Sequence, residues 1–328
     1  MTFRLTRTRT RTAVTLTAAA AVVALVLTGC ARDERPTALQ TGETYTVEHE
    51  FGVTEVPLGA DRVAVTFEAL VDSSLAVGVL PIAAPQSFAG FADYLDTDGS
   101  TVASLGESDG DIDVELMGEQ NPELILMNIE SGTDPADTLY EEYSQIAPTI
   151  PIVTGEQNPR KVAEQVGAAL NRSEQMAEVA AAYDARAAEL KTLLAEVPAA
   201  QQTVSQVRLR PDHVRIMMGA TNAGVAMVDA GLTFAEPIAP VEDGGYYEIS
   251  LELLPEATGD YVFVYSTDEG VLENVLTLPI WQEVPAVQAG TAFEVDFEAW
   301  MRGQGYLALN TVLDEIAAAY GVDLPAST

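Results

Sequence analysis

Residues 62–84 read RVAVTFEALVDSSLAVGVLPIAA, and this stretch decides the fold. Its ends, residues 62–66 and 80–84, are short apolar runs, and residues 67–77 between them have helical spacing. Uninterrupted apolar strands on either side of a helix are typical of neighbouring parallel strands buried inside a sheet. The stretch therefore predicts an α/β fold with helices on both faces of a sheet.

The same alternation extends along the rest of the chain. Further strand-like runs lie at residues 123–128, 149–153, 205–209, 214–218, 261–265 and 292–296, and a last amphipathic stretch covers residues 307–320. The region 158–197 interrupts the alternation, because it reads as helical. The sequence therefore predicts two α/β lobes with parallel sheets, at residues 45–157 and 198–328.

A long helix is predicted to join the two lobes. Asn158 followed by Pro159 is typical of a helix start, with an N-cap residue and a proline in the first helical position. After a break at residues 171–173, a second helix is expected at residues 174–196, where a Val-Pro pair ends it. Its apolar side chains recur in steps of four and three, at Met176, Ala180, Tyr183, Ala187, Leu190 and Leu194. One face of this helix is therefore expected to be buried.

The first 29 residues are typical of an export signal. Four arginines without an acidic residue precede an uncharged apolar run at residues 13–28, which is too short for a comfortable membrane span. The only cysteine of the chain, Cys30, follows the tripeptide LTG, and this sequence resembles the lipobox of bacterial lipoproteins. That resemblance implies cleavage before Cys30 and acylation of its thiol, with residues 30–44 as a flexible tether. Secretion with a spare thiol is the alternative.

The chain is strongly acidic, with 16 lysines and arginines against 50 aspartates and glutamates. Removal of the signal would take four arginines away and leave the mature protein still more acidic. Nucleic acid and anionic lipid are poor partners on electrostatic grounds, so no nucleic-acid partner is expected. The charge favours solubility and an outward-facing setting.

Several stretches, in order along the chain, resemble one family of proteins. They are residues 62–84, LGESDGDIDVELMGEQNPELILMN (105–128), YEEYSQIAPTIPI (140–152), VSQVRLRPDHVRIM (204–217), VDAGL (228–232), EISLELLPE (248–256), PIWQEVPAVQAGTAFEVD (279–296) and W-x-x-G-x-G from Trp300. The mature chain resembles the substrate-binding lipoproteins of ABC importers that deliver iron–siderophore complexes, haem or cobalamin. The resemblance implies two Rossmann-like lobes bridged by one rigid helix, with the ligand in the cleft between them.

Neither a bare metal ion as cargo nor a bound cofactor is expected. The two histidines, His49 and His213, are far apart in the sequence, and zinc or manganese sites need several converging ligands. Ferric tris-catecholates are strongly anionic and favour several cleft arginines, whereas ferric hydroxamates are nearly neutral. A ferric hydroxamate is therefore favoured, because few basic residues lie outside the signal, the tether and the helical region: Arg62, which precedes its strand, Arg208, Arg210, Arg215 and Arg302.

Candidate ligand contacts come from the resemblance and from aromatic residues near glycine-containing loops. Arg208 and Arg210 alternate on one strand and so point to the same face, and the resemblance implies that they contact the chelate. Salt bridges to some of the many acids are the alternative role for both. Aromatic side chains supply flat apolar walls with a polar tip. The candidate ligand-binding residues are Arg208, Arg210, Arg302, Phe88, Phe91, Tyr246, Tyr247 and Trp300.

The resemblance also implies one glutamate on each lobe that pairs with arginines of the permease. By their places in DVELMGE and ISLELLPE, these are Glu115 and Glu252. Two fixed anions far apart on one face would set the orientation of the receptor on the importer. The receptor is expected to act as a monomer.

The sequence contains no G-x-S-x-G, H-E-x-x-H or P-loop motif, and two histidines supply little general-base chemistry. An enzyme, such as a lipid-anchored hydrolase, is therefore only a distant alternative. The sequence as a whole predicts a lipid-anchored receptor on the outer face of a Gram-positive-type cell membrane. It would capture a ferric siderophore, with the hydroxamate type favoured, and pass it to an ABC importer. Haem or cobalamin is the alternative cargo.

Overall fold

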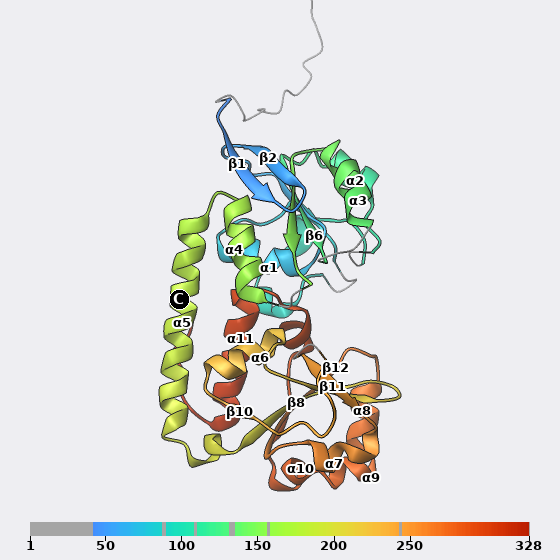
Figure 1. The fold of residues 1–328 in the computed structure, drawn as a ribbon, viewed down its shortest axis with the longest axis vertical. Coiled ribbons are helices and arrows are strands. Elements are labelled where there is room, and N and C mark those ends of the chain that lie inside the picture. The colour runs from blue at the N-terminus through green and yellow to red at the C-terminus, as the bar shows by residue number, and fades with distance from the viewer. Residues whose placement is uncertain are drawn as a thin grey trace, which may run out of the picture. The chain divides into compact units, whose positions relative to one another are not determined.

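The computed structural model describes residues 42–86, 90–107, 110–130, 135–155, 158–242 and 245–327. Cys30, the predicted signal segment and Phe88 lie outside these ranges. Residues 41–328 form one compact unit, in which two α/β lobes are connected by a long helix (Figure 1). None of the helices in the described ranges has the length and apolar character needed to cross a bilayer.

The first lobe contains a five-stranded parallel sheet with the strand order β5-β4-β3-β6-β7. Its strands are β3 (Val63–Val65), β4 (Ala83–Ala84), β5 (Ala103–Ser104), β6 (Leu124–Ile129) and β7 (Thr149–Val153). β3 and β4 pair in parallel, and α1 (Ala69–Ala76) connects them, so the strand–helix–strand prediction for residues 62–84 is confirmed. All three residues of β3 are buried, as a strand covered on both faces requires.

A hairpin of β1 (Thr44–His49) and β2 (Gly52–Pro57) precedes this sheet and contacts β7. The hydroxyl group of Tyr45 donates a hydrogen bond to the carbonyl oxygen of Ala169 at 2.6 Å, which ties the hairpin to the helical region. The other elements of the first lobe are η1 (Asp93–Leu95), η2 (Gly99–Thr101), α2 (Val114–Glu119) and α3 (Pro135–Ser144).

Two consecutive helices, α4 (Pro159–Ala169) and α5 (Ser173–Ala195), connect the lobes. The side chain of Asn158 accepts a hydrogen bond from the Lys161 N–H at 3.2 Å, so the predicted N-cap is confirmed. α5 runs alongside elements of both lobes (Figure 1). Its predicted apolar face is buried at five positions and half-buried at Ala180, the buried ones being Met176, Tyr183, Ala187, Leu190 and Leu194.

The second lobe contains a mixed sheet with the order β11-β9-β8-β12-β13, in which β10 also pairs with β8. The sheet differs from the parallel one predicted, because β9 is antiparallel to both β8 and β11. Only residues 210–213 connect β8 to β9, and a parallel pair needs a crossover of roughly a dozen residues or more. The strands are β8 (Thr203–Leu209), β9 (Val214–Met217), β10 (Thr233–Phe234), β11 (Tyr246–Ile249), β12 (Tyr261–Ser266) and β13 (Ala292–Glu294).

The C-terminal helix α11 (Tyr306–Tyr320) contacts α1, α5 and α6 (Asn222–Asp229), and so belongs to the packing of both lobes. One buried apolar cluster runs from the first sheet through α5 and α11 to the second sheet, with Leu70, Leu313 and Phe263 among its members. The remaining elements are η3 (Pro198–Gln201), η4 (Leu251–Leu253), α7 (Leu254–Ala257), α8 (Val271–Leu276), α9 (Pro279–Gln282), α10 (Pro285–Ala289) and the π-helical turn η5 (Glu298–Arg302).

A buried carboxylate joins α1 of the first lobe to the start of α11. Asp72 is 0% exposed, and its two oxygens accept hydrogen bonds from the backbone N–H groups of Leu307 at 3.1 Å and Ala308 at 2.9 Å. The hydroxyl group of Tyr94 is also hydrogen-bonded to Asp72. A Cβ atom on Gly305 would lie 2.0 Å from Oδ1 of Asp72, so this close approach requires the last glycine of the W-x-x-G-x-G pattern.

A second polar cluster connects the helices α4, α5 and α6. Nη1 of Arg160 on α4 lies 2.7 Å from Oδ1 of Asp184 on α5, and its Nη2 lies 2.8 Å from Oδ2 of Asp229 on α6. The hydroxyl group of Tyr183 donates to the same Asp229 oxygen at 3.1 Å. Because these contacts come from three helices, a rotation of one lobe against the other would have to break them.

The pH dependence of stability provides a test of the buried Asp72. Burial raises the pKa of Asp72 to about 6, although hydrogen bonds from Ala308 and Leu307 oppose the shift. Since the ordinary pKa is about 4, Asp72 stabilises the folded state fully below about pH 4, and this contribution is lost as the pH rises through about 6. Between about pH 7.5 and pH 4, we expect the unfolding free energy of the wild type to rise relative to Asp72→Asn by up to about 3 kcal/mol.

Urea unfolding of the two proteins over a series of pH values measures this difference. Both proteins carry every other carboxyl group, so the titration of those groups cancels in the comparison. Parallel stability profiles for the two proteins would show that Asp72 does not titrate in this range.

Candidate functional site

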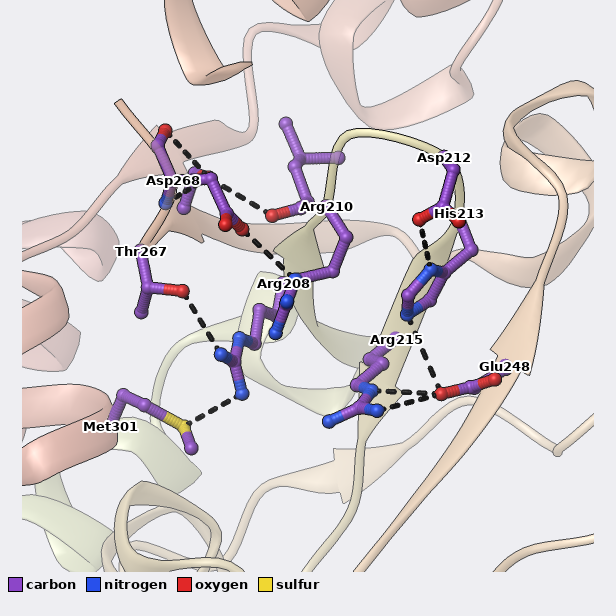
Figure 2. Close-up of polar contacts among 11 residues, drawn as sticks. Arg208, Arg210, Asp212, His213, Arg215, Glu248, Thr267, Asp268 and Met301 are labelled. Carbon is purple, nitrogen blue, oxygen red and sulfur yellow. Dashed lines mark hydrogen bonds and ion pairs between the residues drawn. The ribbon is translucent and has the colours of Figure 1, made fainter. Parts of the chain in front are cut away.

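Three arginines lie together on the sheet of the second lobe. Arg208 is near the end of β8, Arg210 directly follows that strand, and Arg215 is on β9 (Figure 2). Arg208 is directly opposite Arg215 in the antiparallel pair, and Arg215 is opposite Glu248 of β11. Because facing residues of neighbouring strands share one face of a sheet, these side chains form a charged row across it.

Arg210 and Arg215 each form an ion pair with a carboxylate. Nε of Arg210 lies 2.9 Å from Oδ2 of Asp268, which follows β12, and Nη2 of Arg215 lies 2.9 Å from Oε1 of Glu248 (Figure 2). The guanidinium carbon of Arg215 also lies 4.5 Å from the centre of the Tyr246 ring. The charges of Arg210 and Arg215 are therefore largely compensated within the protein.

Arg208, in contrast, pairs with no carboxylate in the described part of the chain. Its Nη2 donates to the hydroxyl group of Thr267 at 2.9 Å, and its Nη1 donates to the sulfur of Met301 at 3.7 Å (Figure 2). Its Nε is buried and has no partner among the described residues, and the residue as a whole is 9% exposed. Burial lowers the pKa of Arg208, but a guanidinium remains charged at neutral pH. A buried cation with neutral partners can bind an anion or donate hydrogen bonds to the oxygens of a ligand.

Arg208 and Arg210 contact consecutive residues, Thr267 and Asp268, in the loop after β12. The two side chains therefore converge on one loop, which agrees with the prediction that they point to the same face of the sheet. Their contact with a ligand stays a prediction.

A cavity of about 240 Å³ lies between the lobes and has an acidic lining. Glu68 and residues 90–93 line it from the first lobe, and Asp296 and Glu298 line it from the second. Arg302 bridges the two sides, because its Nη1 lies 3.6 Å from Oε2 of Glu68 and 3.5 Å from Oε1 of Glu298. Burial raises the pKa of both glutamates, and Arg302 opposes the shift in each case.

Two further predicted contacts lie at this cavity. Phe91 is half-buried and lines it, and Arg302 pairs with two of its carboxylates. Both residues stay candidates for ligand contact, and Phe88 lies outside the described residues.

Larger cavities lie at the carboxyl ends of strands in each lobe, where open α/β sheets bind ligands. One of about 630 Å³ follows β4 and β5 and is lined by Gln86, residues 104–107 and residues 111–113. Another of about 470 Å³ includes Arg210 in its lining and lies beside the turn between β8 and β9. Within the described ranges, no group of three or more histidine, cysteine, aspartate or glutamate side chains could hold a metal ion.

Trp300 was predicted to contact the ligand, but this prediction is wrong because Trp300 belongs to the core. Its side chain is 0% exposed, and its ring stacks on Phe263 with 5.0 Å between the ring centres. The indole N–H donates to Oε2 of Glu315 at 2.7 Å. The neighbouring glycines indicated a loop, but Gly305 instead allows Asp72 of α1 to approach the start of α11 closely.

The prediction for Tyr247 is also wrong, whereas its neighbour Tyr246 stays a candidate. Tyr247 is 0% exposed, and its hydroxyl group donates to the carbonyl oxygen of Ala257 at 3.3 Å. Successive side chains of a strand point to opposite faces, so Tyr246 lies on the side of Arg215 and is half-buried there.

The two candidate docking glutamates are exposed and lie on different lobes. Glu115 is in the first turn of α2, and Glu252 is in η4. Hydrogen bonds from its own backbone N–H and from Ser250 lower the pKa of Glu252. Their role in docking stays a prediction.

Sequence reasoning missed Thr267 and Met301, the two residues that hold Arg208. Thr267 lies outside the quoted motifs, and Met301 occupies a variable position of the W-x-x-G-x-G pattern, 93 positions away from Arg208 in the sequence. Arg62, which precedes β3, donates hydrogen bonds to the carbonyl oxygens of Gln120 and Asn121, beside the amino end of β6.

Alanine substitutions at the two adjacent tyrosines should differ in their effect on stability. Tyr247→Ala is expected to lower the free energy of unfolding by about 3–5 kcal/mol, because it leaves a large cavity in the core. Tyr246→Ala is expected to cost about 1 kcal/mol or less, since it removes mainly a half-exposed contact with Arg215. Urea unfolding of both variants measures the two values, and equal losses would contradict the assignment of Tyr247 to the core.

Comparison with known proteins places the chain in a family. A family model described as "Periplasmic binding protein" matches residues 63–299. The "Probable siderophore-binding lipoprotein YfiY" of Bacillus subtilis is 27% identical over 314 residues, which cover 90% of this chain and 94% of that protein. The "Iron(3+)-hydroxamate-binding protein FhuD" of the same organism is 23% identical, over 84% of this chain and 87% of that protein.

The fold is also shared with a solved structure. It is a FhuD fold-family periplasmic binding protein component of a Fep/Fec-like ferrichrome ABC transporter from Bacillus subtilis, and it aligns with a TM-score of 0.72 and 21% identity. The alignment covers 84% of this chain and 99% of that one. Since the family model spans well over half of the sequence, the chain belongs to the periplasmic binding protein family.

Proposed function

We propose that this protein is the extracytoplasmic receptor of an ABC importer and that it captures a ferric siderophore, preferably of the hydroxamate type. The proposal rests on one observation above all, the buried Arg208 whose guanidinium has only neutral partners in the described chain. In a solute-binding protein, such a cation is available to the oxygen atoms that surround chelated iron. The lobes at residues 45–157 and 198–328, joined by the helical region 158–197, hold the complex between them.

The charges near Arg208 favour a chelate that is close to neutral. Arg210, Arg215 and Arg302 are each paired with carboxylates, and the cavity between the lobes is lined by acids. A ferric complex with about three negative charges would meet several carboxylates in that cavity, and Arg208 of the second-lobe sheet would be the one guanidinium without a carboxylate partner to offset their repulsion. A nearly neutral hydroxamate complex avoids that repulsion, and the name of one relative includes a hydroxamate cargo.

The receptor stays at the outer face of the membrane through lipid on Cys30, with residues 30–44 as its tether, and it delivers the complex as a monomer. The exposed Glu115 and Glu252 bind arginines of the permease, one on each lobe. Rigid packing of the lobes supports this role, because it fixes the distance between the two glutamates.

Binding of a panel of ligands tests the cargo. Titration of the purified protein with ferrioxamine, a ferric tris-catecholate, haem and cobalamin, followed by tryptophan fluorescence, should give the tightest binding for ferrioxamine. Arg208→Ala should weaken that binding about tenfold or more, because it removes a buried charged hydrogen-bond donor. Arg62→Ala is the matched control, since Arg62 lies beside the amino end of β6 and should leave the affinity unchanged.

Each other outcome of the panel has a definite meaning. Tight binding of the catecholate alone would contradict the charge argument, and tight binding of haem or cobalamin alone would replace the cargo. Hydrolysis of an ester or peptide substrate, without binding of any of the four ligands, would point to an enzyme instead.

The lipid anchor has a separate test. Cys30→Ala should move the protein from the membrane fraction to the culture medium, because the acylated thiol is its proposed attachment. Labelling with a radioactive fatty acid should mark the wild type and leave Cys30→Ala unmarked. A variant that stays with the membrane fraction would contradict the anchor.

A further inference from the structure

Met301 lies at the centre of the contacts that hold Arg208. Its sulfur accepts hydrogen bonds from Nη1 of Arg208 and from the hydroxyl group of Tyr265, each at 3.7 Å. Figure 2 shows the sulfur pointing toward the guanidinium from one side, and the hydroxyl group of Thr267 approaching from another. The guanidinium is therefore held at two of its nitrogens by residues from two separate segments, the loop after β12 and η5.

The backbone of Met301 is itself well fixed. Its carbonyl oxygen accepts a hydrogen bond from Nδ2 of Asn222 at 3.4 Å, at the start of α6. Met301 also belongs to η5, a π-helical turn, and such turns are frequent at functional sites. The next residue, Arg302, pairs with Glu68 of the first lobe. The segment that holds Arg208 therefore also contacts the opposite lobe.

Holding two nitrogens matters because a guanidinium is planar. One hydrogen bond, to Thr267, would let the group rotate about that contact, whereas a second contact to Met301 fixes the plane. The second N–H groups of Nη1 and Nη2 then point in a set direction. An orientation fixed before the ligand arrives lowers the entropy cost of binding.

We propose that Met301 is a positioning residue for Arg208, and that its sulfur sets the orientation in which the guanidinium meets the cargo. The inference deepens the proposed function and rests on it, because it takes Arg208 to contact the ferric complex. Met301 itself need not touch the ligand. Its place beside Arg302 also makes the orientation of Arg208 dependent on the contact between the lobes.

A double-mutant cycle tests the inference. Met301→Leu keeps the volume of the side chain but removes the acceptor, so binding of ferrioxamine should weaken about threefold to tenfold. In an Arg208→Ala background, Met301→Leu should change the affinity less than about twofold, since the group that it positions is gone. Met301→Gln restores an acceptor of similar reach and should recover most of the affinity.

A measurement without ligand separates this inference from the proposed function. Nitrogen-15 NMR of the arginine side chains should show slow rotation of the Arg208 guanidinium in the wild type and faster rotation in Met301→Leu. Met227→Leu is the matched control, because Met227 is buried in α6 and none of its described contacts involves Arg208. It should change neither the rotation nor the affinity.

The outcomes of the two measurements are distinct. If the wild type binds none of the four ligands, the proposed function fails, and the NMR comparison still decides the role of Met301. If the wild type binds ferrioxamine but the effects of Met301→Leu and Arg208→Ala are additive, the positioning role is overturned. Unchanged rotation of the guanidinium in Met301→Leu overturns it as well.

Discussion

The hydrogen bonds between the Asp72 carboxylate and the first turn of α11 determine how the two lobes meet. The carboxylate belongs to the first lobe. The N–H groups of Leu307 and Ala308, which donate hydrogen bonds to it, lie just after the last strand and turn of the second lobe. A buried carboxylate is costly without such partners, so the α11 terminus must stay in this place. Gly305 is required there because any side chain would collide with the carboxylate. The position of η5, just before Gly303, follows from this constraint.

That position carries over to the candidate site. Met301 and Arg302 are adjacent in η5, and one contacts Arg208 of the second lobe while the other contacts Glu68 of the first. The Arg160 cluster and the apolar core shared by both lobes strengthen the same arrangement from the side of α5. A large hinge motion would expose a buried carboxylate and break charged contacts together. Small adjustments at the lobe junction are therefore the motion that the structure allows most easily.

The electrostatics of the site differ from those of the molecule as a whole. Acidic residues outnumber basic ones by 50 to 16, and most of the arginines near the candidate site are paired with acids. Arg208 is the exception among the described residues, because its hydrogen-bond partners, Thr267 and Met301, are neutral. Burying this charge without an anionic partner costs free energy, and a bound ligand with negatively polarised oxygens can offset that cost. For this reason Arg208 is the main evidence for the proposed function.

Local sequence patterns were sufficient to determine the elements whose form depends on near neighbours. The strand–helix–strand unit at residues 62–84, the buried face of α5 and the Asn158 cap were predictable, because hydrophobic periodicity and capping act over a few residues. The shared face of Arg208 and Arg210 was also predictable, since the two residues alternate along β8 and its continuation, whereas their contact with a ligand stays a prediction.

Tertiary structure alone decided which side chains at the site are available. Trp300 and Tyr247 resemble Phe91 and Tyr246 in their local sequence, but the first two are buried by residues from distant segments. The backbone partners of Asp72 lie 235 and 236 positions away, and the two partners of Arg208 lie 59 and 93 positions away. Burial and pairing across such separations depend on how the lobes pack, and a local pattern holds no information about them.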